Sequence, residues 1–118
     1  MYTRKIIKND IVEADLSGAI GSEQGKIRPC VVIQNDIGNR HSPTIIVMPL
    51  SSCVKNLHMP THALIKKDEN NGLTVDSITL AEQIRTIDKI RIKYKMGHIY
   101  DENVQNDIKK AYLSSFDL

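Results

Sequence analysis

The sequence predicts a mainly β fold of the α+β class: a small, strongly bent antiparallel sheet or barrel that ends in a helix. Roughly five to seven short runs of β-branched and apolar residues are separated by clusters of Gly, Pro, Asn, Asp and Ser, which favour hairpin turns. After residue 100 the apolar residues change from a period of two to a helical period. The 118 residues are enough for a single domain over 1–118 with its own core.

The predicted strands differ in how their apolar residues are spaced. Val12, Ala14 and Leu16 share one face at period two, while Ile11 interrupts the polar face. The run at 43–51 is almost continuously apolar, so we expect it to be covered on both faces. Strands are expected at 10–16, 28–35, 43–51 and 63–65, with a turn rich in Asn, Asp and Gly at 35–40. The segments 77–80 and 83–87 are expected to form two more short strands or one bulged strand.

The last predicted element is a helix. Asp101 is a suitable N-cap, because its side chain can accept hydrogen bonds from the free N–H groups of the first turn. Val104, Ile108, Ala111 and Tyr112 then form one apolar stripe at helical spacing. We therefore expect a C-terminal helix that lies against the sheet.

Composition narrows the classes of function. With 16 basic and 14 acidic residues the net charge is only +2, so bulk positive charge does not hold this chain to nucleic acid. Four Tyr, one Phe and no Trp argue against a broad base-stacking surface. Binding of RNA or DNA would therefore have to rely on a few well-placed cations.

The cysteines, histidines and hydropathy indicate a protein of the reducing cytoplasm. Cys30 and Cys53 form no Cys-x-x-Cys unit, so we expect both to be free thiols packed as small hydrophobic side chains. The four His residues are scattered, so no metal site is expected. No apolar run approaches the roughly 20 residues of a membrane span, and the charged N-terminus is unlike a signal peptide.

The most informative loop runs from residue 17 to residue 27. It is polar, contains Gly21 and Gly25, and leads into Arg28 and Pro29, where a strand begins. Pro29 has no N–H for a strand ladder, which suits the first residue of a strand. On composition alone Arg28 is an ordinary surface residue. Its other interpretation is a phosphate ligand, because a guanidinium presents paired donors to two phosphate oxygens.

Further side chains have the chemistry for catalysis. Ser51 and Ser52 follow the third predicted strand, but no Gly-x-Ser-x-Gly elbow surrounds them, which disfavours an α/β-hydrolase nucleophile. His62 is either an acid–base group or a structural residue. Strict alternation puts Glu82 on an apolar face, whereas a bulge near Ala81 would turn it outward, and both arrangements stay open.

Two motifs are specific when they occur together: Glu-Gln-Gly-x-x-Arg-Pro at 23–29 and Gln-Ile-Arg-Thr-Ile-Asp at 83–88. With further matches at 10–16, 31–36, 39–44 and 57–62, the chain resembles the MazF/PemK (Kid) toxins of type II toxin–antitoxin pairs. It looks closest to the MazF proteins of Gram-positive bacteria. The matching segments follow the family's order over nearly the whole chain.

The resemblance implies an SH3-like, strongly twisted β-barrel with short helices and a C-terminal helix. It also implies a sequence-specific mRNA endoribonuclease that uses neither a metal nor another cofactor. In that reaction an RNA 2′-OH attacks the adjacent phosphate and leaves a 2′,3′-cyclic phosphate and a 5′-OH. The implied partners are a second copy of the chain, single-stranded RNA across the dimer groove, and a MazE-like antitoxin whose disordered tail occupies that groove.

Residue roles follow from the same resemblance. The catalytic arginine falls on Arg28, and the catalytic threonine falls on Ser51, which keeps the hydroxyl and has Ser52 beside it. The aspartate base of some members corresponds to Glu82, and His62 is a further supporting candidate. RNA contacts are expected from Ser22, Glu23, Gln24, Lys26, Asn39, Arg40, Gln83 and Arg85.

Two alternatives come from other classes of function. One is a poison of DNA gyrase with the same fold, as in the CcdB toxins. The other is a non-catalytic barrel that only binds RNA or an antitoxin. Arg28 together with Glu23 and Gln24 favours the ribonuclease. One departure from the family concerns the Arg-Gly-Asp that often opens the first strand, which is Lys-Asn-Asp at 8–10; Asn tolerates the positive φ of such a turn.

Overall fold

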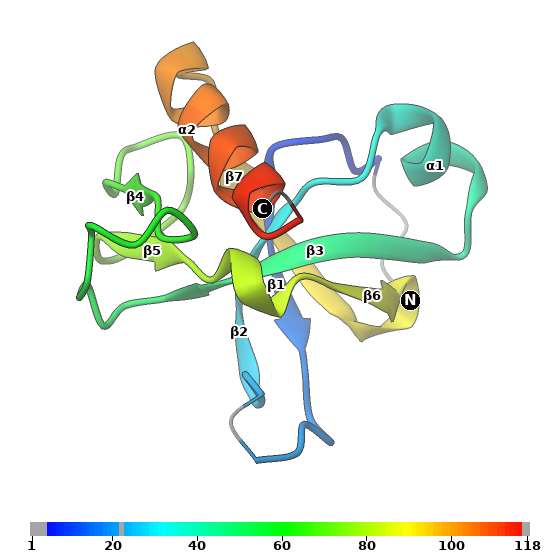
Figure 1. Ribbon diagram of the computed structural model, residues 1–118. Coiled ribbons are helices and arrows are strands. Elements are labelled where there is room, and N and C mark those ends of the chain that lie inside the picture. The colour runs from blue at the N-terminus through cyan, green and yellow to red at the C-terminus, as the bar shows by residue number, and fades with distance from the viewer. Residues whose placement is uncertain (1–4, 22, 117–118) are drawn as a thin grey trace.

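The sheet is organised around β3 (Thr44–Ser51) (Figure 1). β2 (Ile27–Val32) pairs with one side of this strand, and β6 (Arg85–Asp88) and β5 (Ser77–Thr79) pair in succession with the other. The computed structural model describes residues 5–21 and 23–116. The other elements are β1 (Asp10–Asp15), α1 (Asp36–His41), β4 (Leu64–Ile65), η1 (Ala81–Gln83), η2 (Lys89–Arg91), β7 (Ile92–His98) and α2 (Glu102–Ser114).

The strand order is β4-β5-β3-β2-β1-β7, with β6 attached to β3 off this path, and every pairing is antiparallel. Figure 1 shows a strongly curled sheet in which β1 and β2 are steeply inclined to β3. This curled half-barrel with few helices confirms the predicted mainly β fold. Among the described residues, no helix has the length and apolar character needed to cross a bilayer.

The central strands are buried on both faces. On one face Ile11, Val31 and Met48 pack with Ile108 and Ala111 of α2. The opposite face forms a second apolar cluster that includes Val12, Ala14, Leu16, Cys30, Val32, Ile45 and Val47. Alternate residues of the same strand therefore enter different cores, as the period of two requires. The continuous apolar run in β3 is confirmed as a strand covered on both sides.

The C-terminal helix has the predicted cap and stripe. The Asp101 carboxylate accepts hydrogen bonds from the backbone N–H groups of Asn103 and Val104, at 2.8 and 3.4 Å. Ile108 and Ala111 are almost completely buried, while Val104 and Tyr112 are partly buried against the same core. The apolar stripe thus fixes α2 against one face of the sheet.

Two segments differ from the sequence prediction. The turn expected at 35–40 contains a short helix, α1, because the Asn35 side chain caps it by accepting from the Gly38 N–H. The strand β7 was not predicted. At 77–87 the alternative of two short strands is the observed one, as β5 and β6. Between them η1 turns Glu82 outward with 44% of its side chain exposed, so the outward arrangement is also the observed one.

The start of β1 contains a buried carboxylate. Asp10 is fully buried, and its two oxygens lie 3.2 Å from Lys95 Nζ and 2.7 Å from His98 Nδ1. A third contact comes from the Ile7 N–H at 2.8 Å. Residues three apart on a regular strand face opposite sides, but an irregularity in the β1–β7 register lets Lys95 and His98 reach the same carboxylate. Asn9, with φ of 73°, forms the turn that precedes it.

Replacing Asp10 by Asn should destabilise the fold. The substitution keeps the shape but leaves Lys95 without its buried counter-charge and removes a carboxylate oxygen that faces His98, which we expect to cost about 3 kcal/mol. Urea unfolding followed by circular dichroism measures this as a lower midpoint. The exposed Glu69→Gln variant is the matched control, with an expected change of about 0.5 kcal/mol or less. Equal midpoints for the two variants would contradict a stabilising role of the Asp10 cluster.

Candidate active site

The candidate site lies where β2 and β3 part. Their ladder pairs Val32 with Val47, Val31 with Met48 and Cys30 with Pro49, and it ends there. Neither Pro49 nor Pro29 has an N–H to continue the ladder. A continued ladder would set Arg28 opposite Ser51, but the observed pairing stops two residues earlier. Arg28 and Ser51, which the sequence assigned to catalysis, therefore follow on either side of the point where the two strands part.

Arg28 is held by two backbone carbonyls. Its Nε donates to the Gly25 carbonyl at 2.9 Å, and its Nη1 donates to the Leu50 carbonyl at 3.3 Å. A guanidinium has five N–H donors, so these two bonds fix its direction and leave other donors for a ligand. Among the described residues, no carboxylate lies within ion-pair distance of Arg28. The positive charge is therefore oriented without being neutralised.

The loop between β1 and β2 forms a cavity against Arg28, which we call the loop cavity. It has a volume of about 510 Å³ and is lined by Ser17, Gly18, Ala19, Glu23, Gln24, Gly25, Lys26 and Arg28. The Glu23 carboxylate accepts from the Ile20 N–H at 2.7 Å, which closes a turn inside the loop. The Gln24 N–H donates to the side-chain carbonyl of Gln83, which ties the loop to η1. Ser22 lies outside the described residues.

The two serines at the end of β3 differ in their environment. Ser51 is partly buried, and its Oγ accepts a hydrogen bond from the Cys53 N–H at 3.1 Å. Its own hydroxyl proton is then available to a ligand. Ser52 is exposed and shares a second cavity with Arg28. Ser52, and not Ser51, is among the residues that line this second cavity.

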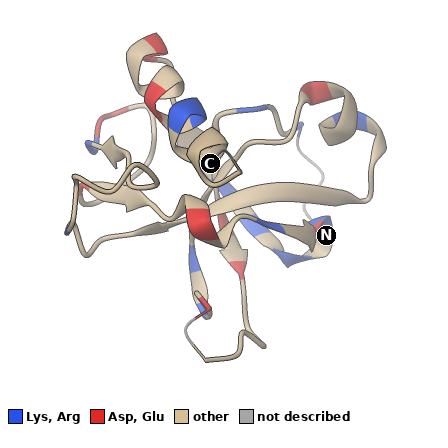
Figure 2. Ribbon diagram, viewed as in Figure 1, with Lys and Arg blue, Asp and Glu red and all other residues tan. Residues whose placement is uncertain are grey.

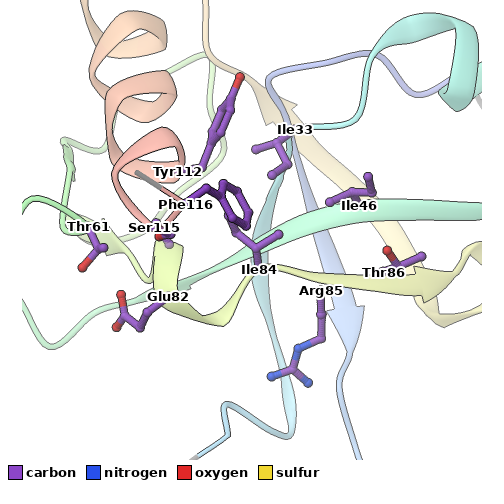
Figure 3. Close-up of a pocket in the computed structure, with 11 residues that line it drawn as sticks. Ile33, Ile46, Thr61, Glu82, Ile84, Arg85, Thr86, Tyr112, Ser115 and Phe116 are labelled. Carbon is purple, nitrogen blue, oxygen red and sulfur yellow. The ribbon is translucent and has the colours of Figure 1, made fainter. Parts of the chain in front are cut away.

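A third cavity, of about 680 Å³, separates the end of α2 from β6 and η1 (Figure 3). In Figure 3, Phe116 and Tyr112 face its apolar interior beside Ile33 and Ile84, whereas the Arg85 side chain points away from them. Arg85 also lines a smaller cavity with Glu23 of the loop. The arginine thus lies between the apolar groove and the loop that contacts Arg28.

The family model for the "PemK-like, MazF-like toxin of type II toxin-antitoxin system" matches residues 8–114 of this chain. The match covers nearly the whole length and includes every candidate site residue. The chain belongs to the PemK/MazF toxin family.

Three relatives illustrate how far this likeness extends. The chain is 50% identical over 95 residues to Endoribonuclease EndoA of Bacillus subtilis, and the alignment covers 80% of this chain and 81% of EndoA. The crystal structure of MazF from Deinococcus radiodurans superposes with a TM-score of 0.81 at 18% identity, covering 98% and 100% of the two chains. An endoribonuclease from a mycobacterial species, solved with its cognate antitoxin, superposes with a TM-score of 0.75 at 18% identity over 94% of each chain. At these identities the two solved structures show the shared fold.

Glu82 and His62 form a pair in this PemK/MazF toxin. His62 Nε2 lies 3.5 Å from Glu82 Oε1, and the other ring nitrogen faces the carbonyls of Lys55 and Asn56 at 3.2 Å. His62 therefore links the loop after β3 to η1. It lines none of the cavities that contain Arg28.

Asn39 and Arg40 are not brought together with the other site residues. They lie in α1, at the opposite end of β3 from Ser51, and eight residues of strand span roughly 23 Å. Asn39 is buried, and its amide group donates to the Gln34 carbonyl at 2.8 Å. Arg40 is exposed. Figure 2 shows basic and acidic segments mixed over both helices and the sheet, in keeping with the small net charge of this PemK/MazF chain.

Arg91 is a site residue that the sequence reasoning missed. Its Nη1 donates to the carbonyls of Asp15 and Ser17 at 3.1 and 3.2 Å, which fixes the start of the loop. It also lines the small cavity of Arg85 and Glu23. In the sequence Arg91 is only one more basic residue close to Arg85. The pairing of β7 with β1 is what shows that it reaches the loop after β1.

The two cysteines have different environments. Burial raises the pKa of the Cys30 thiol to about 12, although the positive charges of Arg28 and Arg85 oppose part of the rise. Cys53 is exposed, so the expectation that both thiols pack as hydrophobic residues is correct only for Cys30. Among the described residues, no group of three His, Cys, Asp or Glu is arranged to hold a metal ion.

Thiol labelling should separate the two cysteines. At pH 8 a disulfide reagent needs an accessible thiolate, and Cys30 is both buried and protonated at that pH. We expect Ellman's reagent to react with one thiol per chain in the folded protein and with both after denaturation. A Cys53→Ser variant should show no fast reaction in the folded state. Fast labelling of Cys30 in that variant would contradict the buried position beneath Arg28.

Proposed function

We propose that the chain is a metal-independent endoribonuclease toxin that cleaves single-stranded RNA in a sequence-specific manner. The proposed reaction is attack of a 2′-OH on the adjacent phosphate, with 2′,3′-cyclic phosphate and 5′-OH ends. The observation that carries this proposal is an oriented, un-neutralised Arg28, bonded to the Leu50 carbonyl next to Ser51, in a member of the PemK/MazF family. The 50% identity to a protein named an endoribonuclease supports it.

Arg28 and Ser51 would act on different oxygens of the phosphate. The free donors of Arg28 stabilise the negative charge of the pentavalent transition state and can reach the leaving 5′-oxygen. A guanidinium is a very weak acid whose neutral form is hardly populated, so Arg28 cannot serve as the base and its proposed role is that of stabiliser and acid. The Ser51 hydroxyl accepts a hydrogen bond from the Cys53 N–H and would donate its own proton to a non-bridging oxygen of the phosphate.

Proton abstraction relies on positioning more than on a strong base. Glu82 is occupied by His62 and partly exposed, and the Glu23 carboxylate is used by the loop backbone. Holding the 2′-OH in line with the leaving oxygen lowers the activation barrier, because the entropy cost of alignment is met on binding. Glu23, Gln24, Lys26, Gln83 and Arg85 supply the groups around Arg28 that select the RNA.

The proposed partners are a second copy of this chain and a MazE-like antitoxin, in the cytoplasm. The solved relatives include a mycobacterial endoribonuclease with its cognate antitoxin and a MazE–MazF pair from Deinococcus radiodurans. The apolar surface around α2 supports contact with a protein partner, because Phe116 is 73% exposed and Leu113 is 48% exposed. The toxic effect would be arrest of translation through loss of mRNA.

Replacing Arg28 by Ala should abolish RNA cleavage. Loss of one charged donor to the transition state typically lowers the rate by about 10²–10³-fold or more. The assay is digestion of a long RNA in EDTA with mapping of the product ends. Lys109→Ala, an exposed cation on α2, is the control and should cleave normally. Cleavage by Arg28→Ala at the wild-type rate, or a requirement for added Mg²⁺, would exclude this mechanism.

The two serines provide a test of register. Ser51→Ala should slow cleavage by about 10²-fold through loss of a phosphate donor, whereas Ser52→Ala should have the smaller effect on rate. Ser51→Thr keeps the hydroxyl and should keep most of the activity. Single-turnover rates on one short RNA compare the variants directly. A larger loss in Ser52→Ala would assign the catalytic hydroxyl to the neighbouring position.

A further inference from the structure

Arg28 also borders a second cavity, which no candidate role has yet used. We call it the β2–β3 cavity, because it opens where these two strands diverge beyond Pro29 and Pro49. Its volume is about 290 Å³, close to the lower end of the roughly 300–1,000 Å³ of small-ligand sites. Such a volume suits a single flat ring better than a longer ligand. It shares only Arg28 with the loop cavity.

The walls of the β2–β3 cavity are apolar and its polar groups are hydroxyls. The apolar wall consists of Pro29, Leu50, Leu73, Val75 and Met96, and the hydroxyls belong to Ser52, Thr74 and Ser77. Ser77 is buried and donates its proton to the Val75 carbonyl at 3.2 Å, so its oxygen can still accept. Ser52 and Thr74 are exposed at the mouth.

One wall of this cavity is rigid. Gly72 has φ of 74°, and a Cβ there would come within 2.3 Å of the Met96 carbonyl oxygen, so the chain before Leu73 lies directly against β7. Asn71 is buried, donates to the Lys66 carbonyl at 2.9 Å and accepts from the Leu73 N–H at 3.0 Å. The segment that carries Leu73, Thr74 and Val75 is therefore fixed before any ligand arrives.

We propose that the β2–β3 cavity binds one nucleobase of the RNA, next to the phosphate held by Arg28. This inference rests on the proposed function and adds a specificity-determining subsite to it. A nucleobase has flat apolar faces and a polar edge. These features match the apolar walls of the cavity and the hydroxyl groups that line it. A phosphate on Arg28 brings the neighbouring base within one nucleotide of this opening. Thr74 and Ser52 then contact the polar edge of the base.

The test combines a protein variant whose cavity is filled with RNA probes that lack one base. Val75 is half exposed, so Val75→Phe fills the mouth without disturbing a core, and Ile90→Phe is the matched control on η2. The probes are short single-stranded RNAs that span the mapped cleavage site, with 2′-deoxyribose at the attacking position so that they are not cleaved. In each probe one base in turn is replaced by an abasic ribose. Fluorescence anisotropy gives the affinity of each protein for each probe.

We expect the wild type and Ile90→Phe to lose about tenfold or more in affinity at one abasic position beside the cleavage site. Val75→Phe should bind the intact RNA about tenfold more weakly and lose nothing further at that position. Thr74→Val, which keeps the shape and removes the hydroxyl, should relax the base preference there in a digest of a random RNA pool.

Two results would overturn the inference in different ways. If the wild type cleaves RNA but Val75→Phe has the same abasic profile and Thr74→Val the same cleavage preference, the cavity binds no base and the proposed function stands. If the folded wild type cleaves no RNA at all, the proposed function fails and this subsite fails with it.

Discussion

The site depends on the early end of the hydrogen-bond ladder between β2 and β3. Pro29 and Pro49 lie on neighbouring strands at nearly the same level, and neither can donate to the other strand. β2 and β3 therefore separate while β1 and β5 continue to hold their outer sides. The Leu50 carbonyl then accepts from the Arg28 side chain beyond the end of the ladder. The gap at the sheet centre thus creates both the opening and the anchor for its cation.

The double core makes this opening rigid. Strands buried on both faces cannot shift without disturbing two packed clusters at once. The loop at 17–27 lacks such packing and is fixed by polar contacts instead, through Arg91 at its start and Gln83 near its end. This division sets Arg28, the proposed phosphate ligand, on the stiff part of the molecule and the proposed base-selecting groups on the adaptable part.

The sequence predicts those parts of the fold whose signal is local. β1 and β3 are within a residue of their predicted bounds and α2 begins after its predicted cap, because alternation, a continuous apolar run and a cap each act within one element. β7 was missed since Lys93, Lys95 and Gly97 weaken its apolar pattern and bulges interrupt its pairing. The helix α1 was missed because Gly and Asn in 36–41 favour a turn unless a cap such as Asn35 stabilises them.

The candidate site is less local than the fold. Nothing in the spacing of residues 28 and 51 reveals that both lie just beyond the end of the β2–β3 ladder, because this depends on the register of the two strands. The resemblance to a family supplied that pairing. The distance between α1 and the end of β3, which separates Asn39 and Arg40 from Arg28, likewise follows only from the length of one strand.

The anchoring of Arg28 by carbonyls has a consequence for the energetics of binding. A phosphate that arrives here displaces no protein carboxylate, so its charge meets that of the arginine directly. Elsewhere the surface mixes basic and acidic groups, so few of the counterions around a single strand are released on binding. Each neutralised phosphate adds only about 0.7 to the logarithmic salt slope for single strands. RNA affinity at this site should thus depend weakly on ionic strength and strongly on the bases that fit.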